Sequence, residues 1–187
     1  MTSKRSNLSD AETRRDAIVE AALRVFAEKG YASTPVTEVA ARAGISQAYV
    51  FKLFPTKEEL FLSAITRCYQ RIEDAMEQAA QQAVSSEPNA VLDAIGDGYA
   101  RLITDRDMLM LQVHAQAATD IPAIREAVKA GMARIVRFAA SRSGADASAV
   151  QRFIAYGQLC HLVVTLGIVD LEDDWARTLT EGLRHFD

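Results

Sequence analysis

The chain has 187 residues, of which 49% are hydrophobic and 25% are charged, values that are typical of a folded globular protein and exclude a disordered one. Its formal net charge of −4 argues, taken alone, against a nucleic-acid partner. Only 4 Pro and 9 Gly interrupt the sequence and period-two clusters of β-branched residues are absent, so an all-α fold is predicted.

Neither a metal site nor a membrane segment is indicated. Cys68 and Cys160 lie far apart and form no CxxC pattern, so we expect no zinc site, no redox pair and no cofactor. Such sparse cysteine is typical of the cytoplasm. The polar N-terminus does not look like a secretory signal, and the longest apolar run, residues 162–169, is too short to span a membrane.

Charge is unevenly distributed along the chain. Residues 1–57 hold nine Lys/Arg against six Asp/Glu, whereas the remaining residues hold twelve against nineteen. A basic head on an acidic body can bind DNA while the body stays away from the phosphates. This division predicts two domains, at residues 1–57 and 58–187.

Glycine and proline mark the first predicted elements. Residues 1–10 are predicted to be a flexible arm, and an apolar stripe predicts a helix over residues 10–29, which Gly30 ends. Thr34 and Pro35 have the residue types favoured at the N-cap and the first position of a second helix.

The following boundaries are marked in the same way. Gly44 ends the second helix, Ser46 is expected to cap a short third helix, and Pro55 closes it. Thr56 is expected to cap a long fourth helix that runs to about Val84. Further helices are predicted at about residues 89–104, 106–118, 121–142, 147–168 and 172–186.

Residues 34–54 have the sequence form of a helix-turn-helix. The small Ala40 lets two helices cross closely, Gly44 suits the turn, and Ile45 is expected to fill the space beneath it. In this motif the second helix lies in the major groove and reads base edges from its N-terminal residues. An N-terminal DNA-binding domain is therefore predicted.

The predicted recognition helix combines core and contact residues. Val50 and Phe54 are expected in the core, and Phe51 lies either in the core, which is favoured, or against the sugar-phosphate backbone. Gln47 is either a partner for adenine or an ordinary surface residue, whereas Tyr49 is expected to be exposed and to contact DNA. The predicted DNA contacts are Thr34, Thr37, Ser46, Gln47, Ala48, Tyr49, Phe51, Lys52 and Lys57.

Residues 15–65 resemble the DNA-binding domain of the TetR family of regulators. The resemblance rests on three segments, IVEAALRVFAEKGY (18–31), TPVTEVAARAGIS (34–46) and QAYVFKLFPTKEEL (47–60). Four positions depart from the family pattern: Ala48, Tyr49, Phe51 and Leu53. These departures weaken the contacts that the resemblance would assign to positions 51 and 53, and they suggest an operator read partly by Tyr49.

The resemblance implies a particular mode of action. It implies a homodimer whose two heads enter successive major grooves of a palindromic double-stranded DNA operator, and a repressor that a small-molecule effector releases. It also implies that the helices at about 147–168 and 172–186 form the dimer interface.

The C-terminal half is less informative. Methionines with a few polar groups suit an adaptable ligand pocket, although an ordinary helical core has the same composition. The candidate ligand contacts are Tyr99, Met108, His114 and Met132. The helix predicted over residues 147–168 is apolar on most faces, which favours burial by a partner subunit.

Other functions fit the sequence less well. The three histidines lack HExxH spacing, residues 96–101 lack the third glycine of a dinucleotide fingerprint, and no P-loop or GxSxG is present, so no enzymatic activity is predicted. A protein-interaction module without specific DNA binding remains an alternative. An activator is another, because the sign of regulation depends on where the operator lies.

Overall fold

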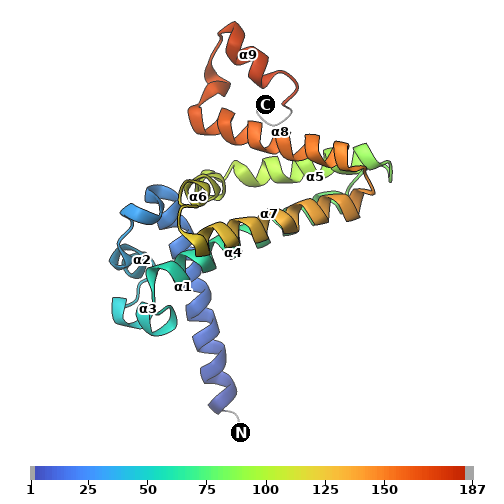
Figure 1. The fold of residues 1–187 in the computed structure, drawn as a ribbon. Helices are drawn as coiled ribbons and strands as arrows, with labels where there is room; N and C mark the ends of the chain where they lie inside the picture. Colours follow the sequence, from blue (N-terminus) through green and yellow to red (C-terminus); the bar gives the residue numbers. More distant parts are fainter. Residues whose placement is uncertain (1–2, 184–187) are drawn as a thin grey trace. The chain divides into compact units, whose positions relative to one another are not determined.

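The computed structural model describes the backbone of residues 3–183 and the side chains of residues 11–183. Its elements are α1 (Ser3–Ser33), α2 (Val36–Arg42), α3 (Gln47–Leu53), α4 (Lys57–Gln81), α5 (Pro88–Ile103), α6 (Arg106–Ala117), α7 (Pro122–Ser143), α8 (Ala147–Leu166), the 3-10 turn η1 (Ile168–Asp170) and α9 (Asp174–Thr180) (Figure 1). The all-α prediction, with about nine helices, is confirmed for the described residues. None of the helices there is long and apolar enough to cross a membrane.

The chain divides into two compact units. The first contains the residues up to Cys68 together with Met110–Lys129, and the second contains Tyr69–Leu109 and the residues from Ala130 onward. Helices α4, α6 and α7 each contribute to both units. The domain boundary predicted after residue 57 stays a prediction.

The first unit is built on aromatic and charged contacts between α1 and α4. The rings of Phe26 and Phe61, both fully buried, meet edge to face with centroids 4.7 Å apart. At the surface, Arg67 on α4 pairs with Asp16 at 2.6 Å and with Glu20 at 2.9 Å, both on α1. These contacts hold the start of α4 against α1 and so position the elements between them.

Several helix ends differ from their predictions, most of all the start of α1 and the end of α9; α4 also ends at Gln81 and α8 at Leu166, a few residues earlier than predicted. Helix α1 begins at Ser3, so the arm predicted for residues 1–10 is wrong over 3–10, where neither Gly nor Pro interrupts the helix; residues 1–2 lie outside the described residues. Helix α9 ends at Thr180, because Gly182 takes a left-handed conformation with φ +78°. Residues 184–186 of that predicted helix lie outside the described residues.

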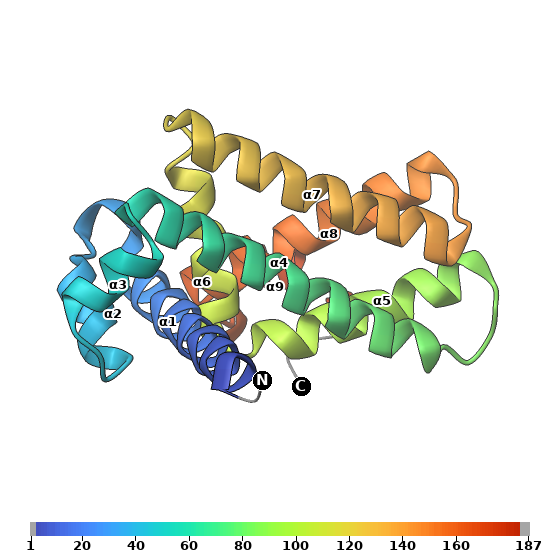
Figure 2. The same cartoon turned by 90° about the horizontal axis from the view of Figure 1, so that it is seen from below.

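In the second unit, α4 lies between α5 and α7 (Figure 2). Glycine allows α5 and α7 to pack closely on α4. A Cβ at Gly98 of α5 would clash with Ala75 and Ala79 of α4, and a Cβ at Gly131 of α7 would clash with the ring of Tyr69 of α4.

Two more helices complete the second unit. Helix α8 runs alongside α5, and α9 lies on the other side of α8 (Figure 1). A small core formed by Val163, Ile168 and Ala176 joins α8, η1 and α9.

Candidate nucleic-acid interface

Helices α2 and α3 form the helix-turn-helix that the sequence predicts. Gly44 adopts φ +68°, and Ile45 donates its backbone N–H to the Ala40 carbonyl at 3.0 Å, which turns the chain between the helices. Ser46 caps α3, since its hydroxyl accepts the backbone N–H of Tyr49 at 3.3 Å. The predicted cap and turn glycine are both confirmed.

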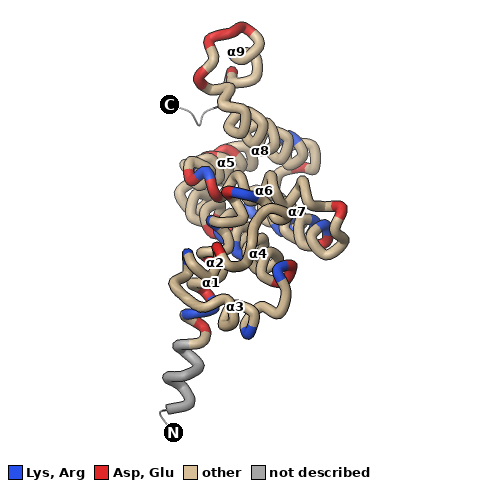
Figure 3. Tube along the Cα trace, turned by 90° about the vertical axis from the view of Figure 1, so that its left-hand side faces the viewer, with Lys and Arg blue, Asp and Glu red and all other residues tan. Residues whose placement is uncertain are grey.

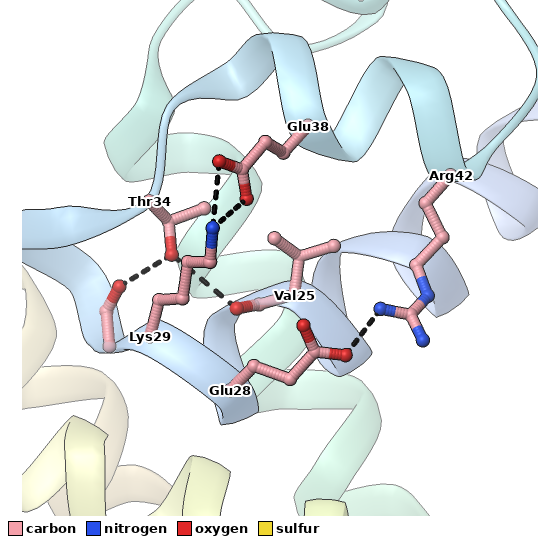
Figure 4. Close-up of polar contacts among 7 residues, drawn as sticks. Val25, Glu28, Lys29, Thr34, Glu38 and Arg42 are labelled. Atoms are coloured by element: carbon pink, nitrogen blue, oxygen red, sulfur yellow. Dashed lines mark hydrogen bonds and ion pairs between the residues drawn. The ribbon is translucent and has the colours of Figure 1, made fainter.

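Two ion pairs attach α2 to the end of α1 (Figure 4). Lys29 meets Glu38 at 2.6 Å, and Arg42 meets Glu28 at 2.5 Å. Both pairs are exposed to solvent, so each contributes at most about 1 kcal/mol. They fix the direction of α2 relative to α1 more than they stabilise the fold.

Thr34 has a different role from the one predicted. Its hydroxyl donates to the Gly30 carbonyl at 2.7 Å, and the residue is only 1% exposed (Figure 4). Pro35 is the N-cap residue of α2 and no side chain caps that helix, so the predicted Thr34 cap is wrong. Because Gly30 breaks the helical path of α1 with φ +74°, its carbonyl is left available to Thr34.

Helix α3 divides into an inner and an outer face. Val50 and Phe54 are buried, as predicted. Phe51 is 39% exposed, so the favoured core placement is wrong, and its one-residue offset from the buried Val50 turns it about 100° around the helix. The exposed side chains of the first turn and outer face are Gln47, Ala48, Phe51 and Lys52.

Tyr49 is half-buried among cations, whereas the sequence predicts an exposed side chain. The Arg14 guanidinium carbon lies 5.6 Å from the centre of its ring, and the Lys52 ammonium lies 5.9 Å from it. Both distances allow a cation–π attraction. Two positive charges therefore flank the aromatic ring at the start of α3.

Arg14 and Arg15 also belong to this region, although no sequence pattern predicted their place there. Arg15 donates to the Leu53 carbonyl at 2.9 Å and lies 4.2 Å from the centre of the Phe54 ring, so it ties α1 to the end of α3. The adjacent basic residues were visible in the sequence, but only the fold brings them to α3. Figure 3 shows basic positions on α1 and α3 in this unit.

Lys57 and Thr37 complete the predicted contacts. Thr37 is exposed on α2. Lys57 is half-buried, and its ammonium donates to the Ala32 carbonyl at 3.1 Å and lies 5.0 Å from the centre of the Tyr31 ring. Burial lowers the pKa of Lys57. The structure thus brings together on one unit all nine predicted contacts, with Thr34 turned inward.

The candidate ligand contacts are divided between the units. Tyr99, Met108 and Met132 belong to the second unit, where Met108 is buried and the other two are half-buried. His114 belongs to the first unit and lies beside Gly30. Among the side chains that the structure describes, no group of three or more His, Cys, Asp or Glu is arranged to hold a metal ion.

The segment that contains the helix-turn-helix is similar to known regulatory proteins. Residues 18–64 match the family model described as bacterial regulatory proteins, tetR family. The transcriptional activator FasR of Mycolicibacterium smegmatis is 30% identical over 135 residues, an alignment that covers 67% of this chain and 61% of FasR. The transcriptional repressor BepR of Brucella suis is 37% identical over 78 residues, covering 42% of this chain and 37% of BepR.

A solved structure shares the fold over nearly the whole chain. The regulator FadR from Bacillus subtilis, solved in complex with stearoyl-CoA, superposes with a TM-score of 0.67 at 17% identity and covers 91% of this chain and 98% of that one. This chain spans only 61% of the length of FasR. The comparisons therefore show the family and the fold of this chain.

Proposed function

This chain belongs to the TetR family of bacterial regulatory proteins, and on that premise we propose that it is a sequence-specific transcriptional repressor. In this proposal a homodimer binds a palindromic DNA operator and a small-molecule effector releases it. The observation that carries the proposal is α3, a capped helix whose first turn is exposed on a helix-turn-helix.

The contacts with DNA follow from what α3 exposes. Gln47, Ala48 and Tyr49 occupy its first turn and face base edges in the major groove. Lys52, Thr37 and Ser46 bind phosphates around them, as does the ammonium of Lys57. Thr34 shapes the α1–α2 junction and makes no DNA contact in this proposal, since it is buried. Arg14 joins the set as a second cation beside Tyr49.

Selection of genomic DNA fragments by the purified protein tests this proposal. The wild type is expected to enrich a palindrome, and a Gln47→Ala/Tyr49→Ala variant is expected to lose that enrichment. Gln82→Ala is the matched control, because Gln82 is an exposed glutamine that follows α4. If the wild type enriches no sequence above a salt-sensitive background, the protein-interaction alternative replaces this one.

The second copy is assigned to a surface on α8, η1 and α9. This C-terminal apolar surface consists of Tyr156, Leu162, Leu166, Val169, Leu171 and Trp175, all of which are exposed. Leu166 is 64% exposed and Trp175 is 54% exposed. Large exposed apolar groups gathered on consecutive elements favour a protein partner, and homodimers are the commonest soluble assembly.

Sedimentation mass measures this part of the proposal. The wild type is expected to sediment as a dimer, and Leu166→Asp as a monomer, because a carboxylate cannot be buried there without a partner. Val84→Asp is the control, since Val84 is 97% exposed and lies outside the surface. A wild type that is monomeric at micromolar concentration contradicts the assigned dimer.

The effector part rests on the continuity of α4 and on the second unit. Helix α4 begins just after α3 and continues into the second unit, so a ligand that shifts its far end can change the spacing of the two heads from the roughly 34–36 Å that successive grooves require. Solved FadR holds stearoyl-CoA, which supports a ligand-binding role for the second unit here. Met108, Met132 and Tyr99 are the proposed contacts there.

The sign of regulation has its own test. FasR is named an activator and BepR a repressor, so relatives of this chain include both kinds of regulator. A reporter placed under the selected operator is expected to rise when the gene for this protein is deleted. A fall in the reporter identifies an activator.

A further inference from the structure

One buried polar cluster in the second unit has unused hydrogen-bonding capacity. His161 on α8 is 6% exposed, and its Nε2 forms a hydrogen bond with the Tyr99 hydroxyl of α5. The two rings stack with centroids 6.0 Å apart. Within the described part of the chain, His161 Nδ1 and Thr165 Oγ1 are buried atoms without a hydrogen-bond partner.

Such atoms call for a partner. A buried polar group left unpaired costs about 1–3 kcal/mol, so nearly all of them in folded proteins are satisfied by protein, water or ligand. His161 and Thr165 are four residues apart on α8, so their side chains lie on the same face, one turn apart. Two unpaired groups on one face indicate one shared partner.

The same face of α8 continues toward its N-terminus through Gly157 and Phe153. Gly157 is one turn before His161, and a Cβ added there would meet nothing within 4 Å. One further turn back, Phe153 packs against Gly96 of α5, 3.7 Å from the position that a Cβ would take. Helices α5 and α8 are therefore in contact at Phe153, whereas a Cβ at Gly157, one turn before His161, would meet nothing within 4 Å.

We propose that Tyr99, His161 and Thr165 form a binding site for an uncharged oxygen acceptor, such as the carbonyl of a mostly apolar small molecule, that lies along α8 beside Gly157. This α5–α8 polar site deepens the effector part of the proposed function and rests on it. The site requires the tautomer in which the Tyr99 hydroxyl donates to Nε2 and the ring proton is on Nδ1. Nδ1–H and the Thr165 hydroxyl then supply two donors to the two lone pairs of one carbonyl oxygen.

The charge of the surroundings selects the ligand class. Burial lowers the pKa of His161 to about 4, so the imidazole is neutral at physiological pH and the site supplies no full positive charge. Arg106 is exposed, and its guanidinium donates to the Val164 carbonyl at 3.5 Å. A buried carboxylate facing only neutral donors is disfavoured relative to a carbonyl.

Three probes with one skeleton separate the possibilities: acetophenone, benzoate and ethylbenzene. The readout is the side-chain nitrogen resonance of His161 in the full-length protein, together with the melting temperature. Acetophenone is expected to shift the Nδ1 resonance and raise the melting temperature, whereas ethylbenzene leaves the resonance unchanged. Thr165→Val, which preserves shape and removes one donor, is expected to weaken acetophenone binding about fivefold.

Controls keep the result interpretable. His161→Phe is expected to abolish the response, and Gln151→Ala, on the exposed side of α8, is expected to retain it. If benzoate binds in preference to acetophenone, the ligand is not an uncharged acceptor. If ethylbenzene shifts the His161 resonance as much as acetophenone does, or if no probe shifts it because only water fills the site, the proposed site is wrong. Operator selection is measured without any probe, so these failures are distinct from failure of DNA binding.

Discussion

At the scale of single residues, Gly30 has two constraints that exclude a side chain. Its φ of +74° and ψ of 175° lie in a region that is essentially restricted to glycine, and a Cβ there would approach His114 Nδ1 to 2.9 Å. We therefore expect Gly30→Ala to lower the free energy of unfolding by about 1–3 kcal/mol, measured by urea titration. Gly44→Ala, where a Cβ meets nothing within 4 Å, is expected to cost less.

A double-mutant cycle separates the two constraints at Gly30. Replacing His114 by Ala removes the steric contact and leaves the backbone strain, so His114→Ala is expected to recover part of the stability that Gly30→Ala loses. If the two substitutions are simply additive, the contact with His114 has no part in the effect.

His161 makes stability depend on pH in a defined window. Its pKa is about 4 in the fold and near 6.5 when unfolded, so the unfolded chain binds the additional proton. Stability is full above pH 6.5 and is lost as the pH falls from 6.5 to 4, by up to about 3 kcal/mol. Urea unfolding at several pH values is expected to show this slope in the wild type and a shallower one in His161→Gln; equal slopes contradict it.

At the scale of elements, the sequence predicted most helix ends because local chemistry determines them. The Ser46 and Thr56 hydroxyls cap their helices by accepting the backbone N–H groups of Tyr49 and Glu59, at 3.3 and 3.0 Å, and Gly44 adopts the positive φ of the turn. These preferences act over three or four residues and are therefore readable from the sequence.

The sequence-based predictions were wrong or incomplete at residues whose role is set by tertiary contacts. Thr34 looked like a cap, but the break at Gly30 offers its hydroxyl a nearer carbonyl. Phe51 looked like core because aromatic residues usually are, yet Val50 and Phe54 already fill the inner face of α3. Arg14 reaches Tyr49 only because α1 packs across α3, a contact between residues 35 positions apart that no local pattern reports.

Helix α3 allows its cap and its DNA contact to be tested separately at Ser46. Ser46→Asp preserves the cap, since a carboxylate also accepts the Tyr49 N–H, so the melting temperature is expected to stay near that of the wild type. The added negative charge faces phosphate in the proposed complex, so affinity for the selected DNA, measured by fluorescence anisotropy, is expected to fall. Unchanged affinity would remove Ser46 from the interface.

At the scale of the whole molecule, an excess of acidic residues beyond residue 57 accompanies a basic head. Acidic positions cluster in the turn before α9 of the second unit, whereas α3 of the first carries Lys52 and no acidic residue (Figure 3). The net charge of −4 therefore does not describe what DNA meets. Binding by such a protein is expected to weaken steeply with salt, because each neutralised phosphate releases counterions.

The salt dependence of DNA affinity also shows whether one or both DNA-binding heads of a dimer contact DNA. Each phosphate contact contributes about −0.9 to the slope of log K against log salt concentration. If a dimer binds with both α3 helices engaged, Lys52→Ala removes two contacts and reduces the magnitude of that slope by about 1.8; one engaged head gives about half of this. Lys129→Ala is the control, since Lys129 pairs with Glu126 on α7 at 2.9 Å. A slope that Lys52→Ala leaves unchanged means that this lysine contacts no phosphate. A change of about half of 1.8, found in a protein that sediments as a dimer, means that only one of the two heads is bound to DNA.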